Sequence, residues 1–293
     1  MALRGKKPEN IEKRLKALFF GGAGVGKTTA AIQFPKPYLI DTEKGAENEQ
    51  YVTLLENNGG AIFQTSDFDD MMSEIKGLLS EKHEYKTLII DPLTVVYNHL
   101  LETSANFLKR ISKEKDATGT EFGRHYAEAD KKMKHLLNLL LRLDMNVIIT
   151  SHMKAVYDEK MKIIDRTFDC YKKLDYLFDL VFEIQKRGKE RVGIVRKSRI
   201  IAFPDSDQFP FSYDEIANRY GTDILEKESK PETLASKEQV HETKRLIEVM
   251  KVDPATWEKW LDKAKCETFD EMPTDIIQKC IDMLKKQLNQ NGE

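Results

Sequence analysis

The segment from Gly21 to Thr28 is the sequence feature that most constrains the fold of this chain. It reads Gly-Gly-Ala-Gly-Val-Gly-Lys-Thr and fits the phosphate-loop pattern at every fixed position. An apolar run at residues 17–20 precedes it, and a helix-forming run at residues 29–32 follows it. Because this pattern binds phosphate between a strand and a helix, we predict a nucleotide site here. A glycine-rich turn with a chance lysine is the alternative.

Each residue type in this segment has a chemical reason. Glycines let the backbone wrap around a phosphate and point several N–H groups inward. Lys27 is expected to reach the β- and γ-phosphates of ATP, and the Thr28 hydroxyl is expected to ligate Mg²⁺. The predicted nucleotide-binding residues are Gly21, Gly22, Ala23, Gly24, Val25, Gly26, Lys27, Thr28 and Thr29.

Apolar strands and amphipathic helices alternate along the chain. Strands are expected at residues 17–20, 38–41, 61–63, 87–91 and 146–150. Helices are expected at residues 27–33, 67–79, 95–110 and 126–142. Continuous apolar strands separated by helices predict an α/β fold with a mainly parallel central sheet flanked by helices. Two further strands, at residues 176–185 and 190–196, are expected to form a hairpin that extends the sheet.

The polar, proline-containing stretch at residues 226–235 predicts a linker that follows a core of residues 1–225. Residues 236–293 predict a small helical C-terminal domain. Its first helix has a capping-box start, and its second begins at an Asp-Pro pair at residues 253–254. Its small core is expected to hold Trp257, Trp260 and Phe269. An aromatic surface for a partner is the alternative for these three residues.

Composition narrows the class of protein. Of 293 residues, 33% are charged and 40% are hydrophobic, as in soluble globular proteins. The net charge of −2 excludes an overall basic field, so nucleic-acid binding would use local patches or an oligomeric surface. No apolar run reaches membrane-spanning length. With Cys170, Cys266 and Cys280 in no metal-ligand spacing, we expect a cytoplasmic protein without a membrane partner.

A second catalytic signal is Asp91, which ends a strongly apolar strand. A carboxylate at this strand end lies beside the phosphate loop and can hold the Mg²⁺ shell. Capping of the next helix is the alternative role. The following residue is Pro92, where many ring ATPases carry a water-activating glutamate. A catalytic base is therefore expected elsewhere in the chain.

Glu43 is the candidate base, since it follows the second strand and can face the γ-phosphate. A surface turn that pairs Glu43 with Lys44 is the alternative. A third signal is Thr-Ser-His at residues 150–152, where a polar group can contact the γ-phosphate, although a lone histidine is more often structural. A fourth is the basic cluster at residues 195–199, which can clamp a nucleotide on an adjacent subunit or form a solvated strand end.

Taken together, these signals resemble the RecA-type recombinase core. That resemblance implies a catalytic set of Lys27, Glu43, His152, Lys197 and Arg199. Glu43 matches the catalytic glutamate, and His152 stands where RecA proteins carry glutamine. Lys197 and Arg199 match the basic pair that acts across the subunit boundary. More narrowly, Ile-Asp-x-Glu-x-Gly, Thr-x-His and Lys-Ser-Arg resemble phage-encoded RecA-core proteins of single-strand annealing and recombination, over about residues 10–225.

Two loops correspond to the DNA-binding loops of RecA proteins, at residues 112–124 and 153–170. Both mix basic side chains with an aromatic, the combination used for backbone attraction and base stacking. Ordinary solvated loops are the alternative. The DNA-binding residues that the resemblance implies are Lys113, Lys115, Phe122, Arg124, Lys154, Tyr157, Lys160, Lys162 and Arg166.

The resemblance implies an ATPase of the bacterial host cytoplasm that binds single-stranded DNA and promotes annealing. It also implies Mg²⁺, a homo-oligomer with ATP at its subunit interfaces, and a single-stranded DNA-binding protein as a further partner. Two other classes stay open. One is a nucleotide-gated interaction protein without a DNA role. The other is a small-molecule kinase, for which the sequence offers no arginine-rich lid.

Overall fold

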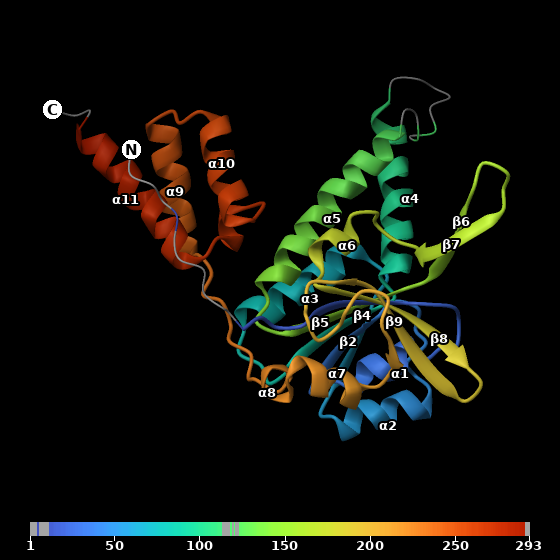
Figure 1. The fold of residues 1–293 in the computed structure, drawn as a ribbon. Coiled ribbons are helices and arrows are strands. Elements are labelled where there is room, and N and C mark those ends of the chain that lie inside the picture. The colour runs from blue at the N-terminus through green and yellow to red at the C-terminus, as the bar shows by residue number, and fades with distance from the viewer. Residues whose placement is uncertain (1–4, 6–11, 113–117, 119, 121–122, 291–293) are drawn as a thin grey trace.

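The computed structural model describes residues 5, 12–112, 118, 120 and 123–290. Its centre is an eight-stranded sheet in the order β10-β9-β8-β1-β5-β4-β2-β3 (Figure 1). The strands of this sheet are β1 (Lys16–Phe20), β2 (Pro37–Asp41), β3 (Ala61–Gln64), β4 (Thr87–Asp91), β5 (Asn146–Ser151), β8 (Leu180–Arg187), β9 (Glu190–Ser198) and β10 (Gln208–Pro210).

Six neighbouring strands, from β8 to β3, pair in parallel, and β9 and β10 add an antiparallel edge. The predicted α/β fold with a mainly parallel sheet is confirmed. The strand β5 lies between β1 and β4. Because parallel strands end at the same edge, the phosphate loop after β1, Asp91 of β4 and the end of β5 meet there.

Helices cover both faces of the sheet (Figure 1). One face packs against α3, α4 and α5, and the other packs against α1, α2 and α7. The helices of the core are α1 (Lys27–Ile32), α2 (Glu49–Asn57), α3 (Phe68–Ser80), α4 (Leu93–Ile111), α5 (Arg124–Arg142), α6 (Leu174–Leu177), α7 (Tyr213–Tyr220) and α8 (Thr222–Leu225).

Alternate residues of each central strand enter different hydrophobic cores. In β1, Leu18 and Phe20 join the core under α3, α4 and α5, whereas Ala17 and Phe19 join the core on the opposite face. This division follows from the two-residue repeat of a strand whose two faces are both covered. Burial on both faces holds the sheet edge, and the residues that it carries, in a fixed arrangement.

The last helices, α9 (Lys237–Val249), α10 (Pro254–Ala264) and α11 (Thr274–Gln290), pack around hydrophobic cores of their own. The predicted capping box is present, because the Ser236 side chain accepts from the Gln239 N–H and the Gln239 side chain accepts from the Ser236 N–H. Phe269 is buried, while Trp257 and Trp260 pack against these cores partly buried. The domain limits at residues 225 and 236 stay predictions.

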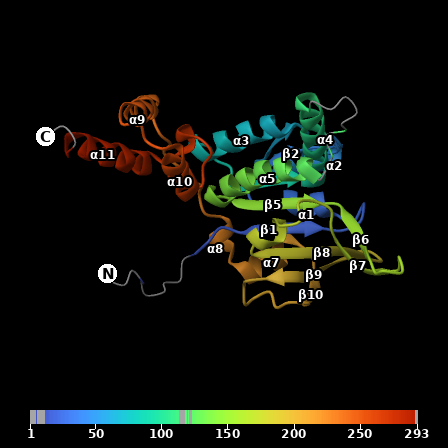
Figure 2. The same cartoon turned by 90° about the horizontal axis from the view of Figure 1, so that it is seen from above.

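The helical unit lies on one side of the sheet, and a two-stranded hairpin projects from the other (Figures 1 and 2). This hairpin, β6 (Met153–Tyr157) and β7 (Ile163–Phe168), occupies the second predicted DNA loop, which is therefore not an irregular loop.

The expected strand over residues 176–185 was placed too early, since α6 ends at Leu177 and β8 begins at Leu180. Helix α2 and the strand β10 had not been predicted. Within the part of the chain that the structure describes, no helix is long and apolar enough to cross a membrane.

Candidate nucleotide site

A cleft of about 550 Å³ opens at the edge of the sheet where β1, β2, β4 and β5 end. The phosphate loop forms one wall, and the turn after β2 forms another. Its lining residues include Gly21, Gly22, Ala23, Gly24, Lys27, Thr28, Asp41, Glu43, Asp91, Pro92, His152 and Met153. The cleft thus gathers Lys27, Thr28, Asp91, Glu43 and His152, each of which the sequence had singled out separately.

The phosphate loop needs its glycines for two reasons. Gly24 and Gly26 have φ values of 69° and 94°, in the left-handed region that favours glycine. A Cβ on Gly21 would lie 2.5 Å from the carbonyl oxygen of Ile184 in β8, so only glycine allows this close approach. The Lys27 ammonium donates to the carbonyls of Gly21 and Gly22 at 3.1 and 3.0 Å, which holds it inside the loop.

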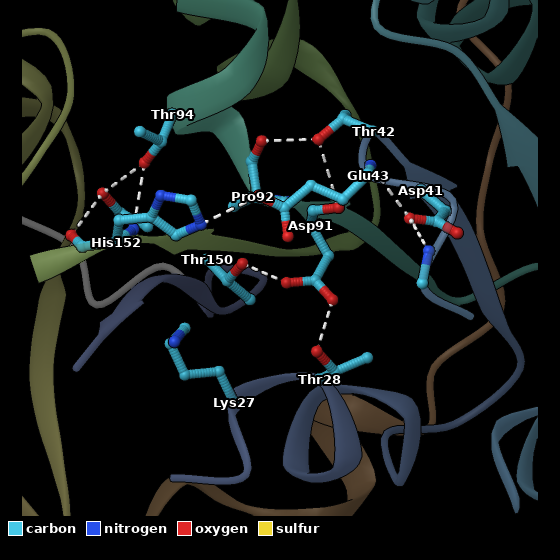
Figure 3. Close-up of polar contacts among 12 residues, drawn as sticks. Lys27, Thr28, Asp41, Thr42, Glu43, Asp91, Pro92, Thr94, Thr150 and His152 are labelled. Carbon is cyan, nitrogen blue, oxygen red and sulfur yellow. Dashed lines mark hydrogen bonds and ion pairs between the residues drawn. The ribbon is translucent and has the colours of Figure 1, made fainter. Parts of the chain in front are cut away.

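Asp91 lies at the floor of the cleft between two hydroxyls (Figure 3). Thr28 Oγ1 donates to Asp91 Oδ2 at 2.6 Å, and Thr150 Oγ1 donates to Asp91 Oδ1. Burial raises the pKa of the Asp91 carboxyl, opposed by these hydrogen bonds and by the nearby Lys27 ammonium. Burial also disfavours the charged form of Lys27 and therefore lowers its pKa, and the negative charges of Asp91 and Glu43 oppose this shift.

The oxygen atoms around Asp91 suit a hard divalent cation. Mg²⁺ prefers oxygen ligands and usually binds through one or two carboxylates together with substrate phosphates. A buried carboxylate beside a threonine hydroxyl provides this chemistry. Thr28 and Asp91 therefore fit the Mg²⁺ role that the sequence predicts for them.

The structure brings the candidate base and the candidate sensor into contact. His152 Nε2 lies 3.0 Å from Glu43 Oε1, and the two side chains are 45% and 47% exposed (Figure 3). They come from the ends of different strands, β5 and β2. Glu43 does not pair with its neighbour Lys44, as the surface-turn alternative would have it, because its carboxylate faces the cleft and His152.

The backbone of His152 is fixed by the first turn of α4, a contact that the sequence did not indicate. The His152 N–H donates to Thr94 Oγ1 at 2.9 Å, and Thr94 Oγ1 lies 3.0 Å from Ser151 Oγ. Thr94 and Ser151 are 1% and 0% exposed. The one sequence signal for this contact is the position of Thr94, three residues after Asp91 at a helix start beside the same edge, and it was not used.

Lys197 and Arg199 do not line the cleft of their own chain. The Lys197 ammonium donates to the carbonyls of Asp175 and Phe178, and Arg199 Nη2 donates to the Tyr176 carbonyl at 2.7 Å. Burial lowers the pKa of Lys197, and the Arg199 charge lowers it further. This pair therefore lies on the surface around α6, away from the chain's own phosphate loop.

The predicted DNA-binding residues lie on the hairpin where the structure describes them. Tyr157 is 51% exposed, and Lys160, Lys162 and Arg166 are exposed as well. Lys154 is exposed too, but its ammonium forms an ion pair with Asp169 at 3.1 Å. Arg124 is exposed at the first turn of α5. The other predicted DNA-binding residues, Lys113, Lys115 and Phe122, lie outside the described residues.

A mainly parallel sheet with this phosphate loop, strand-end aspartate and Mg²⁺-competent oxygen set defines the core of a P-loop nucleotide-binding protein. The family model described as AAA domain matches residues 13–210, more than half of the chain, and the chain belongs to that family. One similar solved structure is the crystal structure of the RadB recombinase, with 20% identity and a TM-score of 0.44. The match covers 69% of this chain and 88% of that one. No curated protein matches the chain.

Proposed function

We propose that this protein binds and hydrolyses Mg-ATP in the cleft and uses it to control binding of single-stranded DNA, which promotes annealing of complementary strands. One observation carries this proposal. Strand β5 ends beside Asp91 with Thr150 and Ser151, and after His152 the chain continues at Met153 directly into the β6–β7 hairpin. The nucleotide cleft and the hairpin are therefore consecutive parts of one segment.

The nucleotide roles follow from the contacts. Lys27 would bind the β- and γ-phosphates, while Thr28 and Asp91 would hold Mg²⁺. The bound ion would neutralise charge on these phosphates. Glu43 would orient and deprotonate the attacking water, because its carboxylate lines the cleft on the side opposite the phosphate loop. His152 would report the nucleotide state to the hairpin, since it touches Glu43 and precedes β6 directly.

We infer a homo-oligomer from the position of Lys197 and Arg199. Lys197 and Arg199 are held at the surface near α6 and do not line their own cleft. We place them at the ATP of an adjacent subunit, where two cations would stabilise the charge that develops on the γ-phosphate. ATP would then stabilise a homo-oligomer, because each nucleotide would be bound by two chains.

The hairpin supplies the DNA surface of this proposal. Lys160 and Lys162 are exposed at its turn, and Tyr157 is exposed beside them. Lysines attract the phosphate backbone and an aromatic ring stacks on any base, so binding would show little sequence preference. From the motif resemblance to phage annealing proteins, we propose that this activity takes place in the bacterial host cytoplasm. There, a single-stranded DNA-binding protein would share the substrate.

One observation favours a second candidate, a nucleotide-gated interaction protein. The hairpin also exposes Met161, Ile163 and Ile164, which are 76%, 50% and 61% exposed. Clustered exposed apolar side chains are typical of protein-binding surfaces. A protein partner on the hairpin would use the same coupling to the cleft without DNA.

Strand annealing with labelled complementary oligonucleotides separates these candidates. The purified protein is mixed with the two strands with Mg-ATP, with Mg²⁺ alone and with ATP plus a chelator, while phosphate release is measured in parallel. The DNA proposal expects faster annealing and DNA-stimulated phosphate release with Mg-ATP only. ATP binding without any DNA effect would favour the interaction protein.

A further inference from the structure

The turn that carries Glu43 is built around the carboxylate of Asp41, a residue that the roles above do not use. Asp41 Oδ1 accepts the N–H groups of Glu43 at 3.2 Å and Gly45 at 3.3 Å, and Oδ2 accepts the Ala46 N–H at 2.9 Å. Asp41 is 3% exposed. A buried carboxylate that accepts three N–H groups of one turn fixes the path of residues 42–46.

This turn needs such an anchor because its backbone is strained. Lys44 has a φ of 56°, in the left-handed region that a lysine rarely adopts. An unfavourable conformation of this kind persists only where the surroundings determine it. The bonds from Asp41 to the residues on both sides of Lys44 provide that determination.

A second anchor ties the same turn to the Mg²⁺ side of the cleft. Asp41 pairs in register with Asp91 across β2 and β4, and the Thr42 N–H donates to the Asp91 carbonyl at 3.0 Å. Thr42 Oγ1 donates to the Pro92 carbonyl at 2.8 Å. The Cα of Glu43 is thus set relative to Asp91 by buried hydrogen bonds, although its own side chain is half exposed.

We propose that Asp41 is a positioning residue for the catalytic carboxylate of Glu43, and that Thr42 assists it. The proposal rests on the role of Glu43 in the proposed function. A general base works only within hydrogen-bonding reach of its water, and misplacement by about 1 Å can cost about a hundredfold in rate. Asp41 would hold the Glu43 carboxylate within that reach and would act through it, because both Asp41 oxygens already accept N–H groups of the turn.

A double-mutant cycle tests this role. Asp41→Asn keeps the size of the side chain but places an amide N–H₂ group beside the N–H donors of the turn. ATP turnover and ATP affinity are measured for the native protein, Asp41→Asn, Glu43→Gln and the double variant. We expect Asp41→Asn to slow turnover by about tenfold or more with ATP affinity within about threefold, and to have no further effect in the Glu43→Gln background.

A physical readout accompanies the kinetics. Amide hydrogen exchange of residues 42–46 should accelerate in Asp41→Asn. Asp67→Asn is the matched control, because Asp67 Oδ1 also accepts two backbone N–H groups, those of Asp69 and Asp70 at the start of α3. It should leave turnover and exchange of residues 42–46 at native levels. If Asp41→Asn does not fold, Thr42→Val enters the same cycle with the same expected pattern.

The outcomes separate this inference from the function on which it rests. Native turnover in Glu43→Gln would overturn the role of Glu43 and that of Asp41 together. The positioning role alone would be overturned if Glu43→Gln is slow and Asp41→Asn still lowers its turnover by the same factor as in the native protein. Loss of ATP affinity in Asp41→Asn would also overturn it, since Asp41 would then bind nucleotide directly.

Discussion

The nucleotide cleft and the β6–β7 hairpin follow one another in the chain, yet their side chains are arranged in opposite ways. In the cleft, Asp91 and Thr150 are 9% and 0% exposed and bond to each other. On the hairpin, Tyr157 and Met161 are 51% and 76% exposed. The buried polar groups of the cleft are thus held by contacts with each other, whereas these hairpin side chains are free to contact solvent.

Side-chain contacts connect the hairpin to the central sheet. Arg196 of β9 lies 2.5 Å from Asp165 of β7 and 3.1 Å from Glu183 of β8, and it also donates to the Arg166 carbonyl. Glu183 is 5% exposed. The hairpin therefore projects from a root that side-chain contacts tie to β8 and β9.

Lys27→Ala should give the largest effect, because the lysine is the cation inside the phosphate loop. We expect ATP affinity to fall by about a hundredfold or more while the melting temperature stays near native, since the Lys27 ammonium bonds to carbonyls of the loop that lines the cleft. Calorimetric titration with Mg-ATP measures this. Lys82→Ala is the control, because it changes an exposed lysine that precedes β4, at the opposite end of that strand from the cleft. Native affinity in Lys27→Ala would contradict the nucleotide site.

Glu43→Gln should keep ATP bound and slow its turnover by about a hundredfold, within the usual range for a lost general base. The amide keeps the size of the side chain but accepts no proton. Phosphate release at saturating ATP measures this, with Glu47→Gln, a nearby exposed glutamate bonded to Gln64, as the control. Equal turnover in the two variants would leave Glu43 as a turn residue.

Lys197→Ala with Arg199→Ala should reduce turnover and ATP-dependent assembly together, by about tenfold or more, because two charged contacts would be lost. The Lys27→Ala variant lacks the opposite half of the same composite site. Mixing the two impaired proteins should therefore restore part of the activity at mixed interfaces. Mixed oligomers that form but stay inactive would show that the basic pair does not act across the subunit boundary.

Lys160→Ala with Lys162→Ala should weaken binding of single-stranded DNA by about tenfold at moderate salt and flatten its salt dependence, since fewer counterions are released. ATP affinity should stay native, because neither lysine lines the cleft. Anisotropy titrations over a range of salt concentrations measure this. Lys259→Ala with Lys263→Ala on α10 is the matched control. An unchanged salt dependence in the hairpin variant would show that the hairpin lysines do not bind DNA.

The comparison also explains which features could be predicted from the sequence. The phosphate loop and Asp91 are predictable because a local pattern and a run of buried apolar residues determine them. The hairpin was missed as secondary structure because its strands are short and largely exposed, which weakens the apolar alternation. Helix α2 was missed for a similar reason, since Leu55 is its one buried residue.

Contacts between separate strand ends could not be predicted. The sequence named Glu43 and His152 for different roles, but the 3.0 Å contact between them depends on the order of β2, β4 and β5 in the sheet. The bonds from Asp41 to its own turn depend on a left-handed Lys44, which no local pattern signals. Sheet order and backbone conformation supply this information, and spacing along the chain does not.

The affinity for single-stranded DNA with and without Mg-ATP tests most directly whether the cleft and the hairpin are coupled. Anisotropy with a labelled oligonucleotide, read together with particle size, is measured for the native protein, Lys27→Ala and Tyr157→Ala. We predict that Mg-ATP tightens native binding by about tenfold, that Lys27→Ala loses this response, and that Tyr157→Ala keeps it at an affinity weaker by about 1–3 kcal/mol. Equal DNA affinity of the native protein in the presence and absence of Mg-ATP would contradict the coupling.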